Sequence, residues 1–175
     1  VKKDSLYDGV TGKEQDSVFI KNLKPILGYR FCIRGDFDGD DRKETLTEHF
    51  YSLINGKETN KFYQGISYDQ LVGITVLKKP FSFVISDNKK IDTLLISRAG
   101  QWLGLSFLKN EGDLNGDGND EVSYVINSAD WSACNRCHIV SYRKGKWKEI
   151  YSFPIRDWQL PDLPEVQTSY GLLGV

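Results

Sequence analysis

Two short stretches of the sequence concentrate side chains that can bind a metal ion. They are "GDFDGDDRKE" at residues 35–44 and "GDLNGDGNDE" at residues 112–121, which align without gaps at an offset of 77 residues. If Asp36 and Asp113 are numbered as position 1, oxygen-bearing side chains occupy positions 1, 3, 5 and 9 in both. Those residues are Asp36, Asp38, Asp40 and Glu44 in the first stretch, and Asp113, Asn115, Asp117 and Glu121 in the second.

This ligand spacing favours calcium. Ca²⁺ takes six to eight hard oxygen ligands in tolerant geometry, and alternate residues of a tight loop can all point inward. Arg42 and Asn119 at position 7 would each offer a backbone carbonyl, and a glycine at position 4 lets the backbone wrap. Without a cation, carboxylates this close repel strongly. The sequence therefore predicts two calcium sites of about 10⁻⁴–10⁻³ M affinity, with the four-carboxylate first loop the tighter.

Other interpretations of these loops fit less well. An EF-hand loop needs Gly at position 6 and Glu at position 12. Position 6 is Asp41 in the first loop and Gly118 in the second, but position 12 is Thr47 and Tyr124, so neither loop has the closing Glu. Glycosidases use two separate, differently tuned acids across a cleft, so these packed carboxylates do not predict catalysis. Arg34-Gly35-Asp36 forms an adhesion-like tripeptide, but Asp36 would be committed to the metal. A solvated acidic turn is the plain alternative.

The remaining pattern predicts an all-β fold of antiparallel sheets. Short segments rich in β-branched and aromatic residues alternate with Gly, Asn and Asp clusters. Hairpins are predicted at Asn55-Gly56 and around Gly145, and a short helix is plausible only at 66–76. The candidate strands are 17–20, 29–33, 45–53, 81–86, 93–98, 103–108, 121–127, 138–143 and 147–153. We expect a single domain with a loose lead-in at 1–16 and an extended, Pro-containing segment at 154–175.

The two loops resemble a known calcium motif. "DFDGDDRKE" and "DLNGDGNDE" are similar to the D-x-[DN]-G-D-x-x-x-[DE] loops of FG-GAP and VCBS-type repeats, in which the loop joins adjacent strands of a propeller blade. The resemblance implies that the side chains at positions 1, 3, 5 and 9 are calcium ligands. Two loops imply two blade-like units, and 175 residues are short for a closed ring. We therefore expect a reduced or divergent propeller-like assembly.

The cysteines leave several possibilities open. Cys134 and Cys137 precede His138 in a C-x-x-C-H motif, the spacing of c-type haem attachment, and with Cys32 they could supply a zinc site. A thioredoxin-like redox pair is a further option. The simplest expectation is a disulfide between Cys134 and Cys137 with Cys32 free, although Cys32 could pair with either. A disulfide and weak calcium sites favour an extracellular, periplasmic or cell-surface location.

Exposed aromatics near a calcium site could bind a ligand. Trp131 follows the strand after the second loop and Trp158 lies in the Pro-containing segment, so either could stack on a sugar or contact a peptide. The net charge of −1 gives no sign of nucleic-acid binding, and no apolar run approaches the roughly 20 residues of a membrane-spanning helix. Because the chain begins at Val1 and has no Met, we expect a processed or trimmed form. The hypothesis is a secreted or surface-exposed, non-enzymatic calcium-binding domain. The alternative is a calcium-dependent module that recognises a glycan or a protein, and a third is an enzyme or its accessory domain, although no nucleophile–base pair is evident in the sequence.

Overall fold

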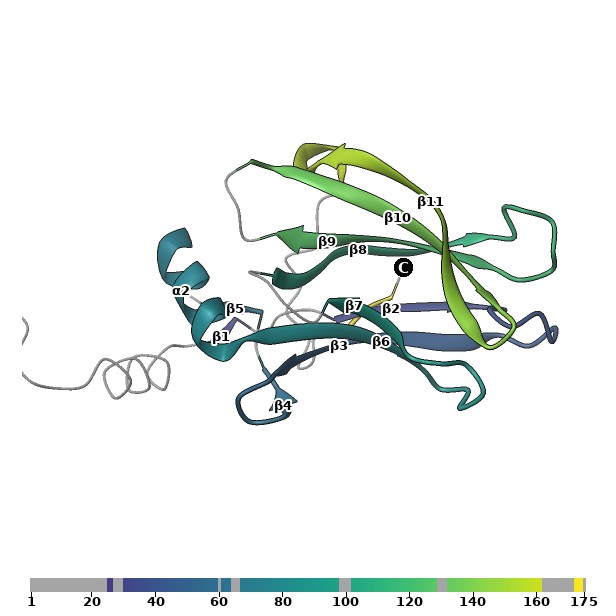
Figure 1. Cartoon of the computed structure of the whole chain (residues 1–175), viewed down its shortest axis with the longest axis horizontal. Coiled ribbons are helices and arrows are strands. Elements are labelled where there is room, and N and C mark those ends of the chain that lie inside the picture. The colour runs from purple at the N-terminus through teal and green to yellow at the C-terminus, as the bar shows by residue number, and fades with distance from the viewer. Residues whose placement is uncertain are drawn as a thin grey trace, which may run out of the picture.

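The two main sheets face each other as layers in the computed structural model (Figure 1). The structure describes residues 25–26, 30–59, 61–63, 67–97, 102–128, 132–161 and 172–174. The all-β, antiparallel architecture expected from the sequence is confirmed. The predicted strand at 17–20 and the lead-in at 1–16 lie outside the described residues.

Each layer is built on four strands that are neighbours in the sheet. The first is ordered β2 (Arg30–Gly35), β3 (Glu44–Ser52), β6 (Pro80–Ser86) and β7 (Leu94–Ser97); the second is ordered β8 (Trp102–Gly112), β9 (Glu121–Ser128), β10 (Cys134–Arg143) and β11 (Lys146–Arg156). In both, the acidic loop joins the first strand to the second. The repeat seen in the sequence is thus part of a repeated four-stranded unit.

Smaller elements complete the described chain. They are β1 (Pro25–Ile26), β5 (Phe62–Tyr63), β4 (Lys57–Glu58), β12 (Leu172–Gly174), the helix α2 (Tyr68–Lys78) and the 3₁₀ turn η1 (Asp157–Gln159). The helix starts at a capping box, in which Gln70 N donates to Ser67 Oγ (3.3 Å) and Ser67 N donates to Gln70 Oε1 (2.9 Å). It corresponds to the short helix expected at 66–76.

The C-terminal segment differs in part from its prediction. Residues 154–156 continue β11, and β12 pairs in parallel with β2 at the edge of the first sheet. An edge strand tolerates Pro154 because one side of its backbone needs no ladder partner. The segment is therefore not extended surface chain throughout.

Both predicted hairpins form, but their turns differ in length. Lys144 (φ +52°) and Gly145 (φ +76°) form a two-residue turn between Arg143 and Lys146, as expected. The hairpin expected at Asn55-Gly56 also forms, between β3 and β4, but its turn spans the four residues 53–56 because the strands pair through Ser52 and Lys57.

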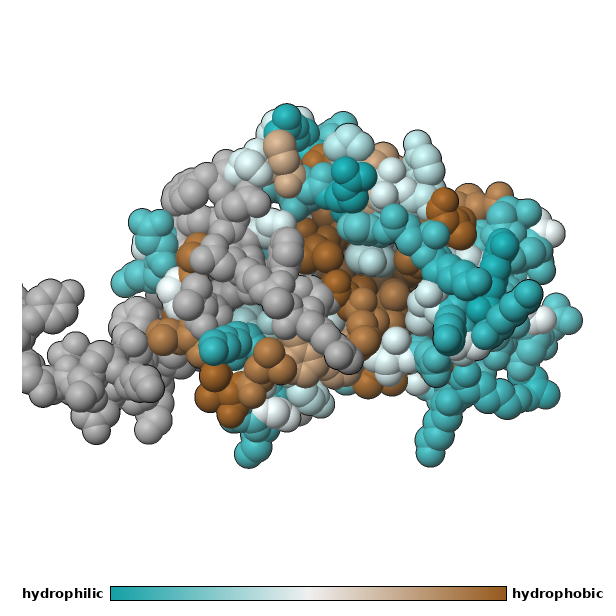
Figure 2. Space-filling view, viewed as in Figure 1, coloured by the Kyte–Doolittle hydropathy of each residue, from teal (hydrophilic) through white to brown (hydrophobic). Residues whose placement is uncertain are grey.

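The core lies between the two layers. It contains inward-facing side chains of both sheets, such as Ile33 and Leu46 from the first and Leu105 and Val122 from the second. Figure 2 shows apolar residues in the gap between the layers and mainly hydrophilic ones at the end that bears the acidic loops. Alternation along β3, where every second residue is buried, is the period-two pattern of a strand with one face on a core.

A buried ion pair joins the layers. Lys61 Nζ donates to both carboxylate oxygens of Glu48 (2.8 and 2.9 Å) and to Leu105 O (2.9 Å), and both side chains are fully buried. Glu48 also accepts the N–H groups of Leu105 (2.8 Å) and Phe31 (3.2 Å). Burial lowers the pKa of Lys61, and the Glu48 carboxylate opposes that effect. Gly104 has φ +83°, a conformation that favours glycine, and a Cβ there would lie 2.4 Å from Lys61 Cε and 2.8 Å from Glu48 Oε1.

Candidate metal centre

The first acidic loop closes around its position-1 carboxylate. Asp36 Oδ1 accepts hydrogen bonds from the backbone N–H groups of Gly39 (2.8 Å) and Asp40 (3.1 Å), and Asp36 Oδ2 accepts one from Asp41 (2.8 Å). Gly39 makes the turn with φ +74°, a left-handed conformation that glycine adopts without steric cost. Three converging N–H groups therefore fix this loop before any ion binds.

The second loop repeats this arrangement bond for bond. Asp113 Oδ1 accepts the N–H groups of Gly116 (2.7 Å) and Asp117 (3.1 Å), its Oδ2 accepts that of Gly118 (2.9 Å), and Gly116 has φ +74°. The hydrogen bond from Gly118 N–H, followed by those from its neighbours, lowers the pKa of Asp113 despite some desolvation. The 77-residue repeat is thus a repeat of backbone conformation.

Three carboxylates of the first loop lie close enough to share one cation. Asp36, Asp38 and Asp40 each present an oxygen within 4.8 Å of the others, and they are the only His, Cys, Asp or Glu cluster of this kind in the described part of the chain. Asp38 Oδ2 accepts a hydrogen bond from Asn88 Nδ2 (3.1 Å), whereas Asp38 Oδ1 is buried and has no partner. A buried carboxylate oxygen without a partner is costly, and a hard cation would satisfy it.

Glu44, at position 9 of the first loop, is buried beside these carboxylates. Its Oε2 accepts the N–H of Phe37 (3.0 Å). Desolvation is the largest cause that raises the pKa of Glu44, and the negative charges of Asp38, Asp36 and Asp40 raise it further. The donor set is all oxygen and strongly anionic, which fits a hard divalent cation such as Ca²⁺.

The second loop has the same conformation but different neighbours. Asp117 Oδ2 forms an ion pair with Arg143 NH2 (2.6 Å), so a protein cation already neutralises its position-5 carboxylate. Asn115 Nδ2 donates to Glu121 Oε1, and Asn119 Nδ2 donates to Tyr142 O (2.7 Å). To bind a metal, Asn115 would have to turn its Oδ1 toward the ion.

The two loops lie side by side through a contact that the sequence did not reveal. Asp120 N donates to Asp36 O (2.7 Å), and Asp36 N donates to Asp120 Oδ2 (3.0 Å). Asn110 Nδ2 donates to the same Asp120 oxygen (2.7 Å) and to Arg34 O (3.1 Å). Asp120 occupies position 8, which holds a lysine in the first loop, so the repeat gave no signal for it. Gly35 of the adhesion-like tripeptide is paired with Glu44 in the sheet.

The cysteines do not converge on one site. Cys134 and Cys137 are three residues apart in β10, so they point to opposite faces; Cys134 is exposed and Cys137 is buried. Three strand residues span roughly 10 Å, which is too far for a disulfide, and both thiols are free, as is Cys32 in the other sheet. The expected Cys134–Cys137 disulfide is therefore absent from this structure.

His138 has a partner of its own. Its Nδ1 lies 2.5 Å from Glu149 Oε2, and its ring stacks on Tyr124 with centroids 4.9 Å apart. The hydrogen bond to His138 lowers the pKa of Glu149. His49 makes a similar pair with Glu58 (2.7 Å). No spacing in the sequence predicted either pair, because their members are 11 and 9 residues apart on neighbouring strands.

Of the two tryptophans expected at a ligand surface, Trp158 is 74% exposed in η1, with Arg156 Cζ 5.7 Å from its ring centroid. Trp131 lies outside the described residues.

Within the described ranges, no helix is both long and apolar enough to cross a membrane. Searches of protein-family models, curated proteins and solved structures found nothing that matches this chain.

Proposed function

We propose that this chain is a calcium-binding β domain in which the first acidic loop is the principal site. The observation that carries the proposal is the convergence of Asp36, Asp38 and Asp40 with one buried, unpartnered oxygen on Asp38. The position-9 carboxylate of Glu44 and the backbone carbonyl of Arg42 would complete the ligand set. Bound calcium would offset two of the four negative charges of these carboxylates and so stabilise this end of the two packed sheets.

The second loop is proposed as a weaker site. Asp113, Asn115, Asp117 and Glu121 would be its side-chain ligands, with Asn119 contributing its carbonyl. Arg143 must give up its ion pair with Asp117, and the Asn115 amide must turn, before an ion can bind. Both changes cost free energy and so lower the calcium affinity of the second loop relative to the first.

The resemblance to FG-GAP and VCBS-type repeats supports the same proposal. In this interpretation each four-stranded unit, β2–β3–β6–β7 and β8–β9–β10–β11, is one blade-like repeat with its loop between the first two strands. Two such units packed face to face would form a reduced propeller-like assembly. Sites of millimolar affinity fill only where calcium is abundant, so we propose an extracellular, periplasmic or cell-surface location and a non-enzymatic role.

Calorimetric titration with Ca²⁺ tests the proposal directly. We expect the wild type to bind calcium with a dissociation constant of about 10⁻⁴–10⁻³ M and to unfold at a higher temperature in calcium than in EDTA. Asp38→Asn should remove the tighter binding event and most of the thermal shift. Magnesium should substitute poorly because it demands stricter octahedral geometry.

Asp41→Asn is the matched control. Asp41 lies in the same loop at position 6 and is exposed, and it has φ +63°, which Asn also tolerates. The substitution removes one negative charge without removing a proposed ligand, so calcium binding should persist. The calcium site would be refuted by an unchanged melting temperature and no heat of binding in about 10 mM Ca²⁺, which is ten times the largest dissociation constant proposed.

A second candidate is a calcium-dependent recognition module for a glycan or a protein. The exposed indole of Trp158 favours it, since a solvent-facing aromatic ring can stack on a sugar. A glycan array probed in calcium and in EDTA, with Trp158→Ala as the control, tests the sugar version. An array without hits in either buffer would remove it.

A further inference from the structure

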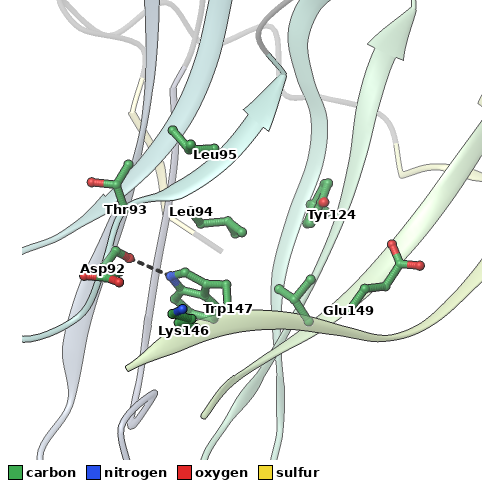
Figure 3. A pocket seen from close by; sticks show the side chains of 9 residues that line it. Asp92, Thr93, Leu94, Leu95, Tyr124, Lys146, Trp147 and Glu149 are labelled. Carbon is green, nitrogen blue, oxygen red and sulfur yellow. Dashed lines mark hydrogen bonds between the residues drawn. The ribbon is translucent and has the colours of Figure 1, made fainter. Parts of the chain in front are cut away.

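A cleft opens between the edges of the two layers, on the side of β7 and β11 (Figure 3). Its volume is about 430 Å³. Tyr124 of β9, Val140 of β10 and Trp147 of β11 line one wall, and Leu94 lines the other. Because these side chains are mainly apolar and aromatic, the cleft is suited to an apolar side chain of a ligand.

One end of the cleft is closed by hydrogen bonds between the layers. Trp147 Nε1 donates to Asp92 O (2.6 Å), as Figure 3 shows, and Asp92 N donates to Tyr142 Oη (3.1 Å). Tyr142 Oη in turn donates to Lys90 O (2.8 Å). These bonds hold the two walls at a fixed separation, so the cleft is formed before a ligand arrives.

The wall formed by β7 borders the cleft with its backbone edge. Residues 92–95, the last two of which begin β7, are consecutive and all line the cleft, although neighbouring strand residues point to opposite faces. On its other side β7 pairs with β6, and it has no second strand partner among the described residues. Alternate N–H and C=O groups of β7 are therefore directed toward the cleft.

The two strands that flank the cleft differ in how they are protected. Edge strands normally carry charges or proline, which prevent another strand from pairing with them. The β11 edge follows that rule, with Lys146, Lys148, Glu149 and Pro154. The β7 edge has the sequence Leu-Leu-Ile-Ser, without a charge or a proline, and Leu95 is 50% exposed. Of the two, β7 is the strand suited to accept a partner.

Three charged side chains line the cleft, with Glu149 toward one end and Asp92 and Lys146 toward the other (Figure 3). The side chain of Glu149 is 48% exposed, and the hydrogen bond with His138 favours its ionised form by lowering its pKa. The same bond fixes the direction of the carboxylate. An extended ligand would therefore meet Asp92 and Lys146 at one end, apolar side chains in the middle of the cleft, and the negative charge of Glu149 at the other end.

We propose that the cleft binds an extended peptide segment of a partner protein, which adds to β7 as a further antiparallel or parallel strand. An aliphatic side chain of that segment enters between Leu94 and Trp147. A Lys or Arg two positions along points to the same side of the strand and pairs with Glu149. Main-chain hydrogen bonds supply affinity and the two side chains supply specificity, as in other cases of strand addition.

Both walls of the cleft are also tied to the acidic loops. Asn88, in the connection that precedes β7, donates to Asp38, and Asn119 of the second loop donates to Tyr142 O. Phe37 of the first loop packs near Trp147, with ring centroids 6.4 Å apart. None of the proposed calcium ligands lines the cleft, so the inference does not depend on the calcium proposal.

An NMR titration with the peptide acetyl-TVTVTKT-amide tests the inference. In EDTA we expect shifts of the backbone amides of residues 93–97 and of the Trp147 indole N–H. Glu149→Gln should weaken binding about threefold to fivefold, the range of an exposed ion pair. Glu58→Gln is the matched control, because Glu58 is also paired with a histidine and is 44% exposed but lies away from the cleft; it should bind as the wild type does.

Three results would overturn the inference. The first is the absence of shifts in residues 93–97 at about 1 mM peptide, the weak limit for such contacts. The second is equal binding by TVTPTKT, because proline removes a main-chain donor that strand addition needs. The third is a dimer, seen by sedimentation, whose β7 amides are already protected, which would assign the edge to a second copy. The titration in EDTA tests the cleft alone, whereas calorimetry with Ca²⁺ tests the metal site. Failure of one proposal can therefore be told from failure of the other.

Discussion

The two acidic loops share one backbone conformation but have opposite relations to the rest of the molecule. Position 2 of the first loop is Phe37, which is fully buried in the core, whereas position 2 of the second is Leu114, which is 55% exposed. Asp40, at position 5 of the first loop, forms no ion pair with another described residue, whereas Asp117 of the second is paired with Arg143. The first loop is thus anchored by apolar packing and left anionic, while the second is less anchored and partly neutralised.

This difference separates what a loop sequence specifies from what its surroundings specify. The position-1 carboxylate accepts hydrogen bonds from backbone N–H groups that lie only three to five positions along the chain. Any chain with this spacing can form them. Neutralisation depends on a residue such as Arg143, which lies 26 positions from Asp117. Glu48 shows the other extreme, because its cation, Lys61, is built into the core.

The largest expected effect tests the anchoring. Phe37→Ala should lower the free energy of unfolding by about 3–5 kcal/mol, because it leaves a cavity in the core. Leu114→Ala should change it by no more than about 0.5 kcal/mol, as at other exposed sites. Urea denaturation of both variants in EDTA measures the difference. Similar losses in the two variants would mean that the loops are anchored alike.

The next effect concerns the buried acids at position 9. Glu121→Gln should cost about 1.5–3 kcal/mol in EDTA, because Glu121 accepts the N–H of Leu114 (2.8 Å) and an amide hydrogen of Asn115 with its charge. Glu44→Gln should cost less in EDTA, since it removes a charge that three other carboxylates repel. Denaturant unfolding of both variants measures this order, and a larger loss for Glu44→Gln would contradict it.

Glu44 also gives a pH dependence in EDTA. Its pKa in the folded protein lies above the ordinary value of 4.5, so the folded state holds this proton more tightly than the unfolded state. The contribution of Glu44 to stability must therefore decrease as the pH rises from about 4.5 through the folded pKa. The free energy of unfolding of the wild type should therefore decrease more steeply with pH across this range than that of Glu44→Gln. Denaturant unfolding of both proteins at several pH values measures the two slopes. Parallel curves would show that Glu44 titrates normally.

A smaller effect should reduce the difference in calcium affinity between the two loops. Arg143→Gln removes the ion pair of Asp117 and should tighten calcium binding at the second loop about threefold to fivefold, the range of an exposed ion pair. Arg136→Gln is a control on the same strand, since Arg136 donates to Ser152 Oγ and lies outside both loops. Calorimetry that gives the same affinity for both variants would show that Arg143 does not compete with the ion.

An effect of similar size lies in the backbone at position 6. Gly118 has φ +93° and Asp41 has φ +63°, so Gly118→Asp should cost about 1 kcal/mol, whereas Asp41→Gly should change stability by a few tenths. Thermal unfolding in EDTA resolves this contrast. Equal effects would mean that the two turns differ less in strain than their φ angles imply.

The sequence predicted the elements well where the pattern was local. Eight of the nine expected strands coincide with described strands, because period-two alternation and Gly or Asn turns act over a few residues. It failed at Cys134 and Cys137, where close spacing suggested a disulfide that an extended strand forbids. It also missed β12 and the short strands, since three or fewer residues carry too little pattern to detect.

The sequence by itself determined the repeat, the fold class and the conformation of both acidic loops, because the bonds that shape those loops span five residues or fewer. Only the tertiary structure decided that Asp38 keeps a buried, unpartnered oxygen, that Arg143 pairs with Asp117, and that Glu48 has Lys61 as its cation. It also decided which strand edge borders a cleft. Burial and long-range charge pairing depend on residues brought together from distant parts of the chain, and spacing along one segment does not record them.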